Sequence, residues 1–383
     1  MTPNARISAA IDILDQVLDG MAAEAALLRW SRASRFVGSG DRNAVRDLVF
    51  DGLRRLRSRA ALGGSLSGRG VILGMCRETA IDPATIFTGE GHAPAPLTAA
   101  EREAGRPPQD AEALDVPDEI WPLWQHSLGS RAKAIAQAMQ DRAPVWLRVN
   151  TLKSNPDAAI AALQAEGIIC QPHPELPTAL KVAEGARKIA ASQAYREGLI
   201  ELQDLSPQLA CAALPKAKRA LDYCAGGGGK SLALAAGGAG NVVAHDANAA
   251  RMSDLTHRAR RAGAHIQIAA PGRVQGLFDL VLADVPCSGS GTWRRTPDAK
   301  WRFNMPMLRN LLQTQQEILD KVVPHVAPNG HLAYMTCSLL TPENDEQIAA
   351  FLARHPDFKP EFQHSFLPPK GSDGFFMAVL RRC

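Results

Sequence analysis

The stretch Phe278-Asp-Leu-Val-Leu-Ala-Asp284-Val-Pro-Cys287-Ser-Gly-Ser-Gly-Thr-Trp-Arg-Arg295 sets the fold and marks the chemistry of this chain. Its first six residues are a short, mostly apolar run, long enough for one buried strand. An acid follows at the end of that strand, then a proline that ends the strand, a thiol and a Ser/Gly-rich turn. Ligands of open α/β sheets bind outside the carboxyl ends of the strands. We therefore expect Asp284 and Cys287 to face a substrate.

A second strand-like run, His331-Leu-Ala-Tyr-Met-Thr336, ends directly before Cys337-Ser338. Neighbouring strands of a sheet lie ~5 Å apart. If these two strands are neighbours, Cys287 and Cys337 face one pocket.

Regular alternation of strands and helices begins at residue 220 and predicts a doubly wound, mostly parallel sheet. Helices are expected near Ser231 and at 248–262, 307–326 and 343–355. Two final strands read as an antiparallel pair that closes the sheet. The expected strands are 220–224, 241–245, 266–269, 278–283, 331–336, 358–362 and 374–380.

The chain before residue 220 divides into regions of different character. Apolar residues at helical spacing predict an all-helical module over residues 1–78, and a Pro-, Ala- and Gly-rich connector follows over 79–116. Three further helices and four short strands predict a small α+β domain over 117–215. The catalytic domain is then expected over 216–383.

The composition points to a globular protein of a reducing compartment. Apolar residues make up 46% of the chain, which suffices for a packed core, and no apolar run reaches the ~18 residues that a membrane span needs. Seven scattered cysteines without a Cys-x-x-Cys pair argue against a disulfide framework and against a zinc site. No secretory signal is visible, so we expect a cytoplasmic protein.

The net charge of +4 is less informative than its distribution, because arginines crowd the N-terminal region. Arginine is the usual contact to phosphate, but a solvated basic helix face explains the same pattern. Both interpretations stay open. The arginines are Arg29, Arg32, Arg35, Arg42, Arg46, Arg54, Arg55, Arg57 and Arg59.

A glycine-only turn follows the first strand of the alternating region, in Leu221-Asp-Tyr-Cys224-Ala-Gly226-Gly-Gly-Gly229-Lys230-Ser231. Glycines let the backbone approach a ligand, and the helix that starts here offers unpaired N–H groups. The glycine spacing of a P-loop is missing, so ATP is not expected. The next strand ends in His245-Asp246, and an acid there commonly holds a ribose, although a helix N-cap is the alternative. A nucleoside-bearing cofactor is expected.

These residues resemble those of a known family. Asp284-Val-Pro-Cys287-Ser-Gly-Ser-Gly-Thr292, with Arg294-Arg295 and Pro297-Asp298, and Tyr334-Met-Thr-Cys337-Ser338 are similar to motifs of the bacterial 16S ribosomal RNA C5-cytosine methyltransferases of the Sun/Fmu (RsmB) family. The resemblance covers residues 115–383. It implies a Rossmann-like, seven-stranded methyltransferase domain that uses S-adenosylmethionine. The N-terminal helices are more loosely similar to that family's NusB-like RNA-binding domain.

The resemblance also implies roles for single residues. Cys337 is the nucleophile that adds to carbon 6 of the base, Asp284 holds the base edge, and Cys287 helps to release the product. RNA from the small ribosomal subunit is the implied partner of a monomeric enzyme that needs neither a metal nor a membrane. Implied contacts to the cofactor come from Cys224, Ala225, Gly226, Gly227, Gly228, Gly229, Lys230, Asp246, Arg251 and Asp284. Implied contacts to RNA come from Arg148, Asn150, Lys153, Arg294, Arg295 and Lys300.

The chain departs from the family pattern at the cofactor site. Gly226-Gly227 stand where the family has Ala-Pro, and Ala269-Ala270 follow the third strand where an acid near the adenine is usual. A non-catalytic RNA-binding protein with a decayed methyltransferase fold is therefore an alternative. The same chemistry on tRNA or 23S rRNA is another, and a DNA methyltransferase would use Cys287 as its nucleophile. A zinc-dependent deaminase needs a second cysteine three residues after Cys287. Position 290 is a serine, so this class of enzyme is excluded.

Overall fold

The computed structural model describes residues 1–383, which form two compact units. One unit comprises Met1–Arg142 together with Thr292–Asn304, and the other comprises Ala143–Gly291 together with Met305–Cys383. The predicted boundaries at 78, 116 and 215 do not coincide with this division. Residues on both sides of position 215 pack in one core of the second unit, whereas residues 117–142 group with the N-terminal helices. Each unit is described by itself.

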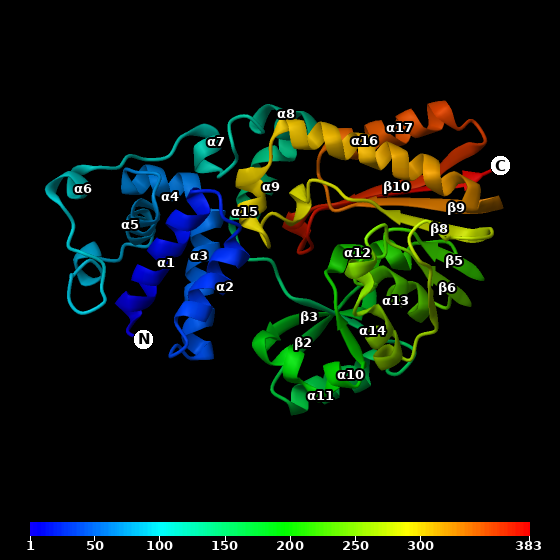
Figure 1. Ribbon diagram of the computed structural model, residues 1–383, viewed down its shortest axis with the longest axis horizontal. Coiled ribbons are helices and arrows are strands. Elements are labelled where there is room, and N and C mark those ends of the chain that lie inside the picture. The colour runs from blue at the N-terminus through cyan, green and yellow to red at the C-terminus, as the bar shows by residue number, and fades with distance from the viewer. The chain divides into compact units, whose positions relative to one another are not determined.

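A seven-stranded sheet forms the centre of the second unit (Figure 1). Its strand order is β10-β11-β9-β8-β5-β6-β7, with β11 antiparallel to both neighbours and all other pairs parallel. This confirms the predicted mostly parallel sheet and its antiparallel closing pair. The strands are β5 (Arg219–Asp222), β6 (Asn241–Ala244), β7 (Ile266–Ile268), β8 (Phe278–Asp284), β9 (Val326–Thr336), β10 (Phe358–Phe366) and β11 (Phe375–Arg382).

The two faces of this sheet bury alternate residues, as the period of two along a strand requires. On one face Val281, Leu332 and Tyr334 pack against helices α16 (Met305–Val322) and α17 (Asp345–Arg354). On the other face Leu282 and Ala333 belong to the core formed with α12 (Leu205–Ala212) and α13 (Gly229–Ala236). Central strands covered on both sides read as continuous apolar runs, which is why they could be predicted.

One predicted helix of this unit begins later than expected and another ends earlier. The segment 248–262 is a short 3-10 turn, Ala249–Met252, followed by α14 (Leu255–Ala262). The segment 307–326 is α16 followed by a 3-10 turn, Val323–His325, because Pro324 lacks the N–H that would continue the helix. Strand β9 then begins at Val326, five residues before the predicted start.

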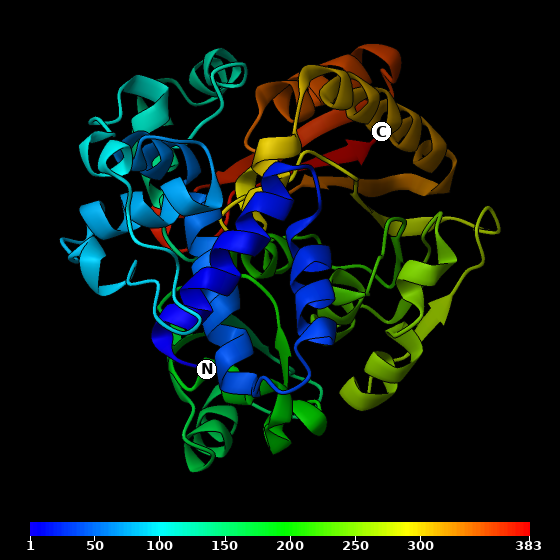
Figure 2. The same ribbon diagram turned by 60° about the vertical axis from the view of Figure 1, so that its left-hand side comes forward.

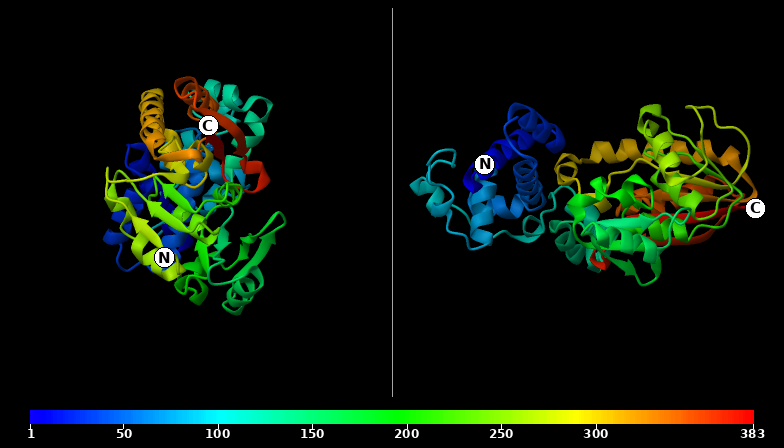
Figure 3. Two further views of the ribbon diagram at one scale, coloured as in Figure 1. Left: turned by 90° about the vertical axis from the view of Figure 1, so that its right-hand side faces the viewer. Right: turned by 90° about the horizontal axis from the view of Figure 1, so that it is seen from below.

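A second sheet of the same unit has four strands in the order β2-β3-β1-β4, all pairs antiparallel, and lies in green in Figure 3. Its core includes Leu147, Leu163 and Leu180. Helix α12 follows its last strand, and Leu205 of that helix packs on Trp146 and Ala179. The elements are β1 (Trp146–Val149), α10 (Pro156–Ala165), β2 (Ile169–His173), β3 (Leu176–Glu184), α11 (Gln193–Arg196) and β4 (Ile200–Leu202).

The N-terminal unit is helical, as predicted, and its first helices are blue in Figure 2. Ile86 and Phe87 of the predicted connector belong to its core, so this part of the connector is packed against the helices. The inserted segment Thr292–Asn304 also belongs here, because Trp293 stacks on Trp124 with ring centroids 5.8 Å apart. The helices are α1 (Pro3–Leu18), α2 (Ala23–Ala33), α3 (Ser39–Arg54), α4 (Leu56–Gly63), α5 (Gly68–Glu78), α6 (Ala99–Glu103), α7 (Asp110–Ala113), α8 (Trp121–Leu128), α9 (Ala132–Gln140) and α15 (Pro297–Arg302).

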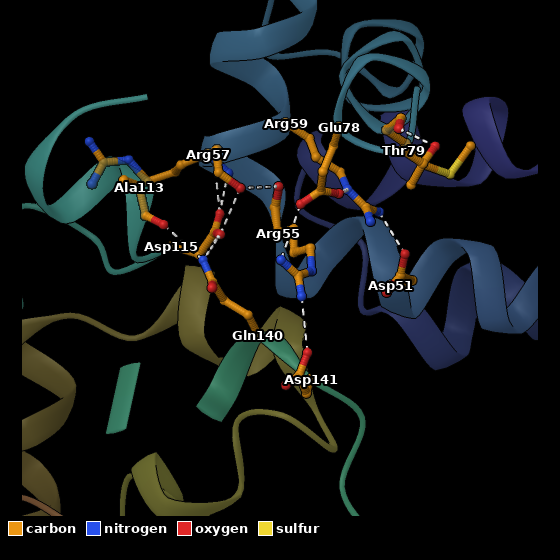
Figure 4. A network of polar contacts seen from close by, with 12 residues as sticks. Asp51, Arg55, Arg57, Arg59, Glu78, Thr79, Ala113, Asp115, Gln140 and Asp141 are labelled. Atoms are coloured by element: carbon orange, nitrogen blue, oxygen red, sulfur yellow. Dashed lines mark hydrogen bonds and ion pairs between the residues drawn. The ribbon is translucent and has the colours of Figure 1, made fainter. Parts of the chain in front are cut away.

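Several arginines of the N-terminal cluster are tied to acids inside this unit (Figure 4). Arg55 pairs with Glu78 at 3.1 Å and with Asp141 at 3.0 Å. Arg59, which is 4% exposed, pairs with Asp51 at 2.7 Å and with Glu78 at 2.8 Å. These two guanidinium groups therefore hold helices together and are not free for phosphate. Arg29, Arg32 and Arg35 are exposed.

No helix in the structure is both long enough and apolar enough to cross a membrane.

Candidate active site

The glycine turn lies between β5 and α13, as expected. Gly228, at φ +80°, caps the start of α13, and a Cβ on it would lie 2.1 Å from a methyl carbon of Leu255. Only glycine fits there without moving α14. Asp246 follows β6 and is 3% exposed; its carboxylate accepts hydrogen bonds from the backbone N–H groups of Gly226 and Asn248, both at 2.9 Å. Arg251 lies 3.3 Å from the same carboxylate. The predicted cofactor residues of this region thus gather at one end of the sheet.

Asp222 is a site residue that the sequence analysis missed. It ends β5, is 1% exposed, and accepts a hydrogen bond from the Ser231 hydroxyl at 2.6 Å through one oxygen. Its other oxygen has no hydrogen-bond partner. Burial raises the pKa of this carboxyl to about 6, although the Ser231 hydrogen bond and Lys230 act against the rise. Its position at a strand end, like that of Asp246 and Asp284, is the signal that would have found it.

A cavity of about 210 Å³ opens beside Asp222. Its walls come from the glycine turn, from the end of β8 and from the segment between β4 and α12. They are formed by Gln203, Pro207, Asp222, Cys224, Ala225, Gly229, Lys230 and Asp284. Four of the predicted cofactor residues and the predicted base-binding acid therefore line one space.

The two thiols of the predicted pocket are neighbours. Cys287 Sγ lies 3.3 Å from Cys337 Sγ, and neither residue is fully buried. Strands β8 and β9, which carry them, pair in parallel with Asp284 opposite Met335. The expectation that two adjacent strand ends bring both sulfurs to one side of the sheet is therefore met.

The surroundings of the two thiols shift their pKa values in opposite directions. The hydrogen bond from Cys287 lowers the pKa of Cys337, and the Lys230 ammonium lowers it further, while burial and Asp284 oppose the shift. The same hydrogen bond, together with burial, raises the pKa of Cys287 well above its usual range. Of the two thiols, Cys337 is therefore the one that ionises more readily, and the thiolate is the state that a nucleophile needs.

Lys230 and Asp284 form an ion pair at the end of β8, with Lys230 Nζ 2.5 Å from Asp284 Oδ2. Burial alone would lower the pKa of Lys230, but the attraction of Asp284 outweighs it and leaves the pKa above its ordinary value. The side chain of Asp284 is 28% exposed, so it is accessible to a ligand. This pair joins the glycine turn to the cysteine-bearing strand.

A buried acid ties the two cysteine loops together, and no pattern in the sequence signals its burial. Glu343 is 0% exposed and accepts hydrogen bonds from the backbone N–H of Ser288 at 2.8 Å and from the Ser288 and Ser338 hydroxyls, both at 2.5 Å. Gln315 of α16 donates to it at 3.0 Å. Because Ser288 follows Cys287 and Ser338 follows Cys337, this one carboxyl group fixes the position of both loops.

Two glycines hold the Cys287 loop against the start of β11. The backbone N–H of Gly291 donates to the Cys337 carbonyl at 2.9 Å, and the N–H of Gly374 donates to the Gly291 carbonyl at 2.9 Å. A Cβ on Gly291 would lie 2.1 Å from the Gly374 carbonyl oxygen. The backbones are therefore too close for any side chain at position 291.

Gly291→Ala is expected to lower the free energy of unfolding by ~1–3 kcal/mol, because the added methyl group must push two backbone segments apart. Differential scanning calorimetry checks the melting temperature. Gly40→Ala is the control, since a Cβ at that position of α3 meets nothing within 4 Å. Equal melting temperatures for Gly291→Ala and the parent protein would contradict the prediction.

The structure gives most of the predicted RNA-binding residues protein partners. Arg148 is 7% exposed and donates to the Gln203 side chain at 2.7 Å, and Asn150, 2% exposed, donates to the carbonyls of Gly198 and Ala262. Lys300 is 4% exposed, and burial lowers its pKa to about 8. These three positions do not fit a contact to phosphate.

The remaining predicted RNA contacts lie in different settings. Arg294 is 4% exposed, and its carbonyl accepts a hydrogen bond from Arg54 at 2.7 Å. Arg295 and Lys153 are exposed. Two of the six predicted residues thus remain accessible for RNA. Spacing along the sequence does not reveal which cations are satisfied by carbonyl or amide oxygens far away in the chain.

The strand order, the glycine turn after β5 and the acid after β6 together define the fold of S-adenosylmethionine-dependent methyltransferases. Solved structures share this fold. The structure titled "Crystal Structure of PH0851" has a TM-score of 0.79 at 23% identity and covers 100% of this chain and 99% of that chain. NSun6 from Pyrococcus horikoshii has a TM-score of 0.63 at 17% identity and covers 70% of this chain and 98% of that chain.

The family model described as 16S rRNA methyltransferase RsmB/F matches residues 211–381, and a ferredoxin-like domain model of the same family matches residues 117–188. Ribosomal RNA small subunit methyltransferase B of Cronobacter sakazakii is 34% identical over 289 residues, which cover 69% of this chain and 67% of that protein. The relative of the same name in Klebsiella pneumoniae is 35% identical over 282 residues, 68% of this chain and 63% of that protein. These matches span about two thirds of the length of the relatives. The chain belongs to the RsmB/F methyltransferase family.

S-adenosylmethionine is the cofactor of this family, and the residues of the site fit it. The unpartnered oxygen of Asp222 would accept a hydrogen bond from the cofactor's ammonium group, and Asp246 would accept one from a ribose hydroxyl. The backbone of 224–229 approaches closely because it is rich in glycine. After β7, Ala269 and Ala270 offer no side-chain hydrogen bond to the adenine, as their sequence already indicated.

Asp222→Asn is expected to stabilise the protein at neutral pH while weakening cofactor binding. The pKa of Asp222 is raised from 3.8 to about 6, so the native state binds more protons than the unfolded state between these values. Stability therefore falls as the pH rises through this window and stays reduced above it. Removing the charge should restore ~1–3 kcal/mol at neutral pH and flatten the dependence between about pH 4 and 6.

Thermal melts across that pH range, with calorimetric titration of S-adenosylmethionine, check both effects. Asp279→Asn is the control, because the exposed Asp279 carboxylate accepts hydrogen bonds from the N–H groups of Lys218 and Arg219 at 3.0 and 2.9 Å. That variant should not gain stability. A less stable Asp222→Asn protein, or one with undiminished cofactor affinity, would contradict the prediction.

Proposed function

We propose that this chain methylates carbon 5 of a cytosine in 16S ribosomal RNA, through a covalent bond between Cys337 and carbon 6 of the base. The observation that carries the proposal is the pair of sulfurs 3.3 Å apart, beside the Lys230–Asp284 ion pair and the cofactor cavity. The names of the curated relatives support ribosomal RNA as the substrate.

The first step depends on ionisation of Cys337, whose pKa is lowered by the hydrogen bond from Cys287. Carbon 5 of cytosine is a weak nucleophile, and addition of the Cys337 thiolate to carbon 6 makes carbon 5 enamine-like and reactive. The environment favours the thiolate at Cys337 over Cys287. This assignment separates the proposal from the DNA methyltransferase alternative, in which Cys287 would attack.

Asp284 acts on the base during the addition, and Cys287 acts on it afterwards. Asp284 is half-exposed at the end of β8, so its carboxyl group can hydrogen-bond the base edge and the ring nitrogen that gains a proton on addition. Bound S-adenosylmethionine supplies the methyl group that carbon 5 takes up. Cys287, next to Cys337, then assists loss of the carbon 5 proton, after which Cys337 leaves carbon 6. The target base must first be unstacked into the pocket.

The test is to incubate the purified protein with 16S rRNA transcript and methyl-labelled S-adenosylmethionine, followed by bisulfite sequencing. One protected cytosine in the 16S rRNA is expected, with no protection in 23S rRNA or tRNA transcripts. Protection only in 23S rRNA or tRNA would change the substrate, and a label in another base would contradict the C5 chemistry. Calorimetric titration with S-adenosylmethionine tests the alternative of a non-catalytic RNA-binding protein with a decayed methyltransferase fold. That alternative predicts no binding at millimolar cofactor.

A further inference from the structure

A basic pocket of about 550 Å³ lies in the second unit, with a lining separate from that of the cofactor cavity. It opens between α14 and the segment around α11, and none of its residues lines the cofactor cavity. The pocket is lined by Lys153, Arg196, Glu197, Leu199, His257, Arg260 and Arg261. Four lysine or arginine cations face one carboxylate there, an excess of three positive charges with histidine neutral.

Some of these cations build the pocket. Arg261 lies over the Tyr195 ring, 4.1 Å from its centroid, and pairs with the buried Glu201 at 2.5 Å. Arg258, one turn earlier on α14, pairs with the same carboxylate at 2.9 Å. Asn150 donates to the carbonyls of both Gly198 and Ala262, which joins the two walls. These contacts make the floor of the pocket rigid. The Glu201 carboxylate beneath it is already paired with two guanidinium groups.

Other basic side chains are free to meet a ligand. Arg260 and His257 are exposed, and the structure gives neither side chain a hydrogen bond or an ion pair. Lys153 is exposed and donates to the carbonyl of Glu197 at 2.9 Å, which leaves two of its ammonium protons unused. The Glu197 carboxylate accepts from Gln193 at 2.7 Å and pairs with none of these cations.

We propose that this pocket binds the phosphate backbone of the RNA substrate away from the target base. The inference rests on the proposed function, since it takes the substrate to be RNA. Unpaired guanidinium and ammonium groups around a preformed concave surface suit the oxygens of consecutive phosphates, and they carry no base specificity. An acidic protein segment would need apolar anchors besides its charges, and Leu199 is the only apolar residue in the lining of the pocket.

The pocket is also connected to the cofactor site through α14. Arg258 of this helix donates a hydrogen bond to the Gly227 carbonyl in the glycine turn. Leu255 at the start of the helix packs against Gly228. RNA that binds to the basic side of α14 is therefore bound to the helix that also supports the glycine turn. The contact positions RNA on the catalytic domain itself.

The experiment measures the affinity of the full-length protein for 16S rRNA transcript by filter binding over a series of salt concentrations. Arg260→Glu is the principal variant and Lys153→Glu with Arg260→Glu the stronger one. Lys359→Glu is the matched control, because Lys359 is an exposed cation on β10, at the opposite edge of the seven-stranded sheet from β7 and α14. Melting temperature and S-adenosylmethionine affinity verify that each variant is folded.

We expect Arg260→Glu to weaken RNA binding about 10-fold and the double variant about 100-fold. The slope of log Kd against log salt should shrink by about one for each phosphate group that the variant no longer binds. Lys359→Glu should change the affinity less than twofold. Equal effects of Arg260→Glu and Lys359→Glu on the affinity, or no effect of either, would overturn the inference but leave the methylation assay of the parent protein untouched. A parent protein that does not bind RNA would overturn both.

Discussion

Cys337→Ala is expected to abolish methyl transfer, with a loss of at least ~10⁴-fold in kcat/KM, because the variant lacks the thiolate that we propose bonds to carbon 6. The lowered pKa of Cys337 and the raised pKa of Cys287 support this assignment of the two roles. The measurement uses RNA that carries 5-fluorocytosine, from which the carbon 5 substituent cannot leave as a proton. The parent protein should form a covalent RNA adduct that survives denaturing electrophoresis, and Cys337→Ala should form none.

Cys287→Ala should behave in the opposite way and accumulate the adduct even on ordinary RNA, because release is impaired while addition remains. Cys383→Ala is the control, since Cys383 is an exposed residue far along the chain from both motifs. Adduct formation by Cys337→Ala, together with its loss in Cys287→Ala, would transfer the nucleophile to Cys287. Such a result would also favour the mechanism of the DNA methyltransferases.

The core of this site could be predicted because its signals are local. An apolar run followed by an acid or a thiol marks a buried strand and its carboxyl end, and two such runs predicted the neighbouring sulfurs of Cys287 and Cys337. The same reasoning placed Asp246 beside the glycine turn. It missed Asp222 because the predicted strand 220–224 placed this acid inside the strand, whereas β5 ends at Asp222.

The remaining features depend on contacts between residues far apart in sequence. Glu343 reads as an ordinary acid after a proline, and only the fold reveals that it is fully buried between two serines. Arg59 and Lys300 read as surface cations, yet one is paired with acids and the other is buried beside Trp301. Whether a cation is free for RNA is decided by such partners, which leave no periodic trace in the sequence.

Lys230→Met is the second substitution with a large expected effect, because Lys230 serves the cofactor cavity, Asp284 and Cys337 together. Without the ammonium group, Cys337 loses one of the two interactions that lower its pKa, so the pKa of Cys337 should rise. Less thiolate is then present at neutral pH, and kcat/KM should fall by ~10²–10³-fold. The loss should be smaller at alkaline pH, where the thiol ionises again.

The rate of Cys337 alkylation by iodoacetamide, followed by mass spectrometry as a function of pH, reports this pKa directly and does not depend on catalysis. The profile should move to higher pH in Lys230→Met and stay near its original position in Lys230→Arg, which keeps the positive charge. RNA affinity should be unchanged in both variants, because Lys230 lines the cofactor cavity and not the basic pocket. If the profile does not move in Lys230→Met, the hydrogen bond from Cys287 alone lowers the pKa of Cys337. Lys230 then has no part in activating the nucleophile.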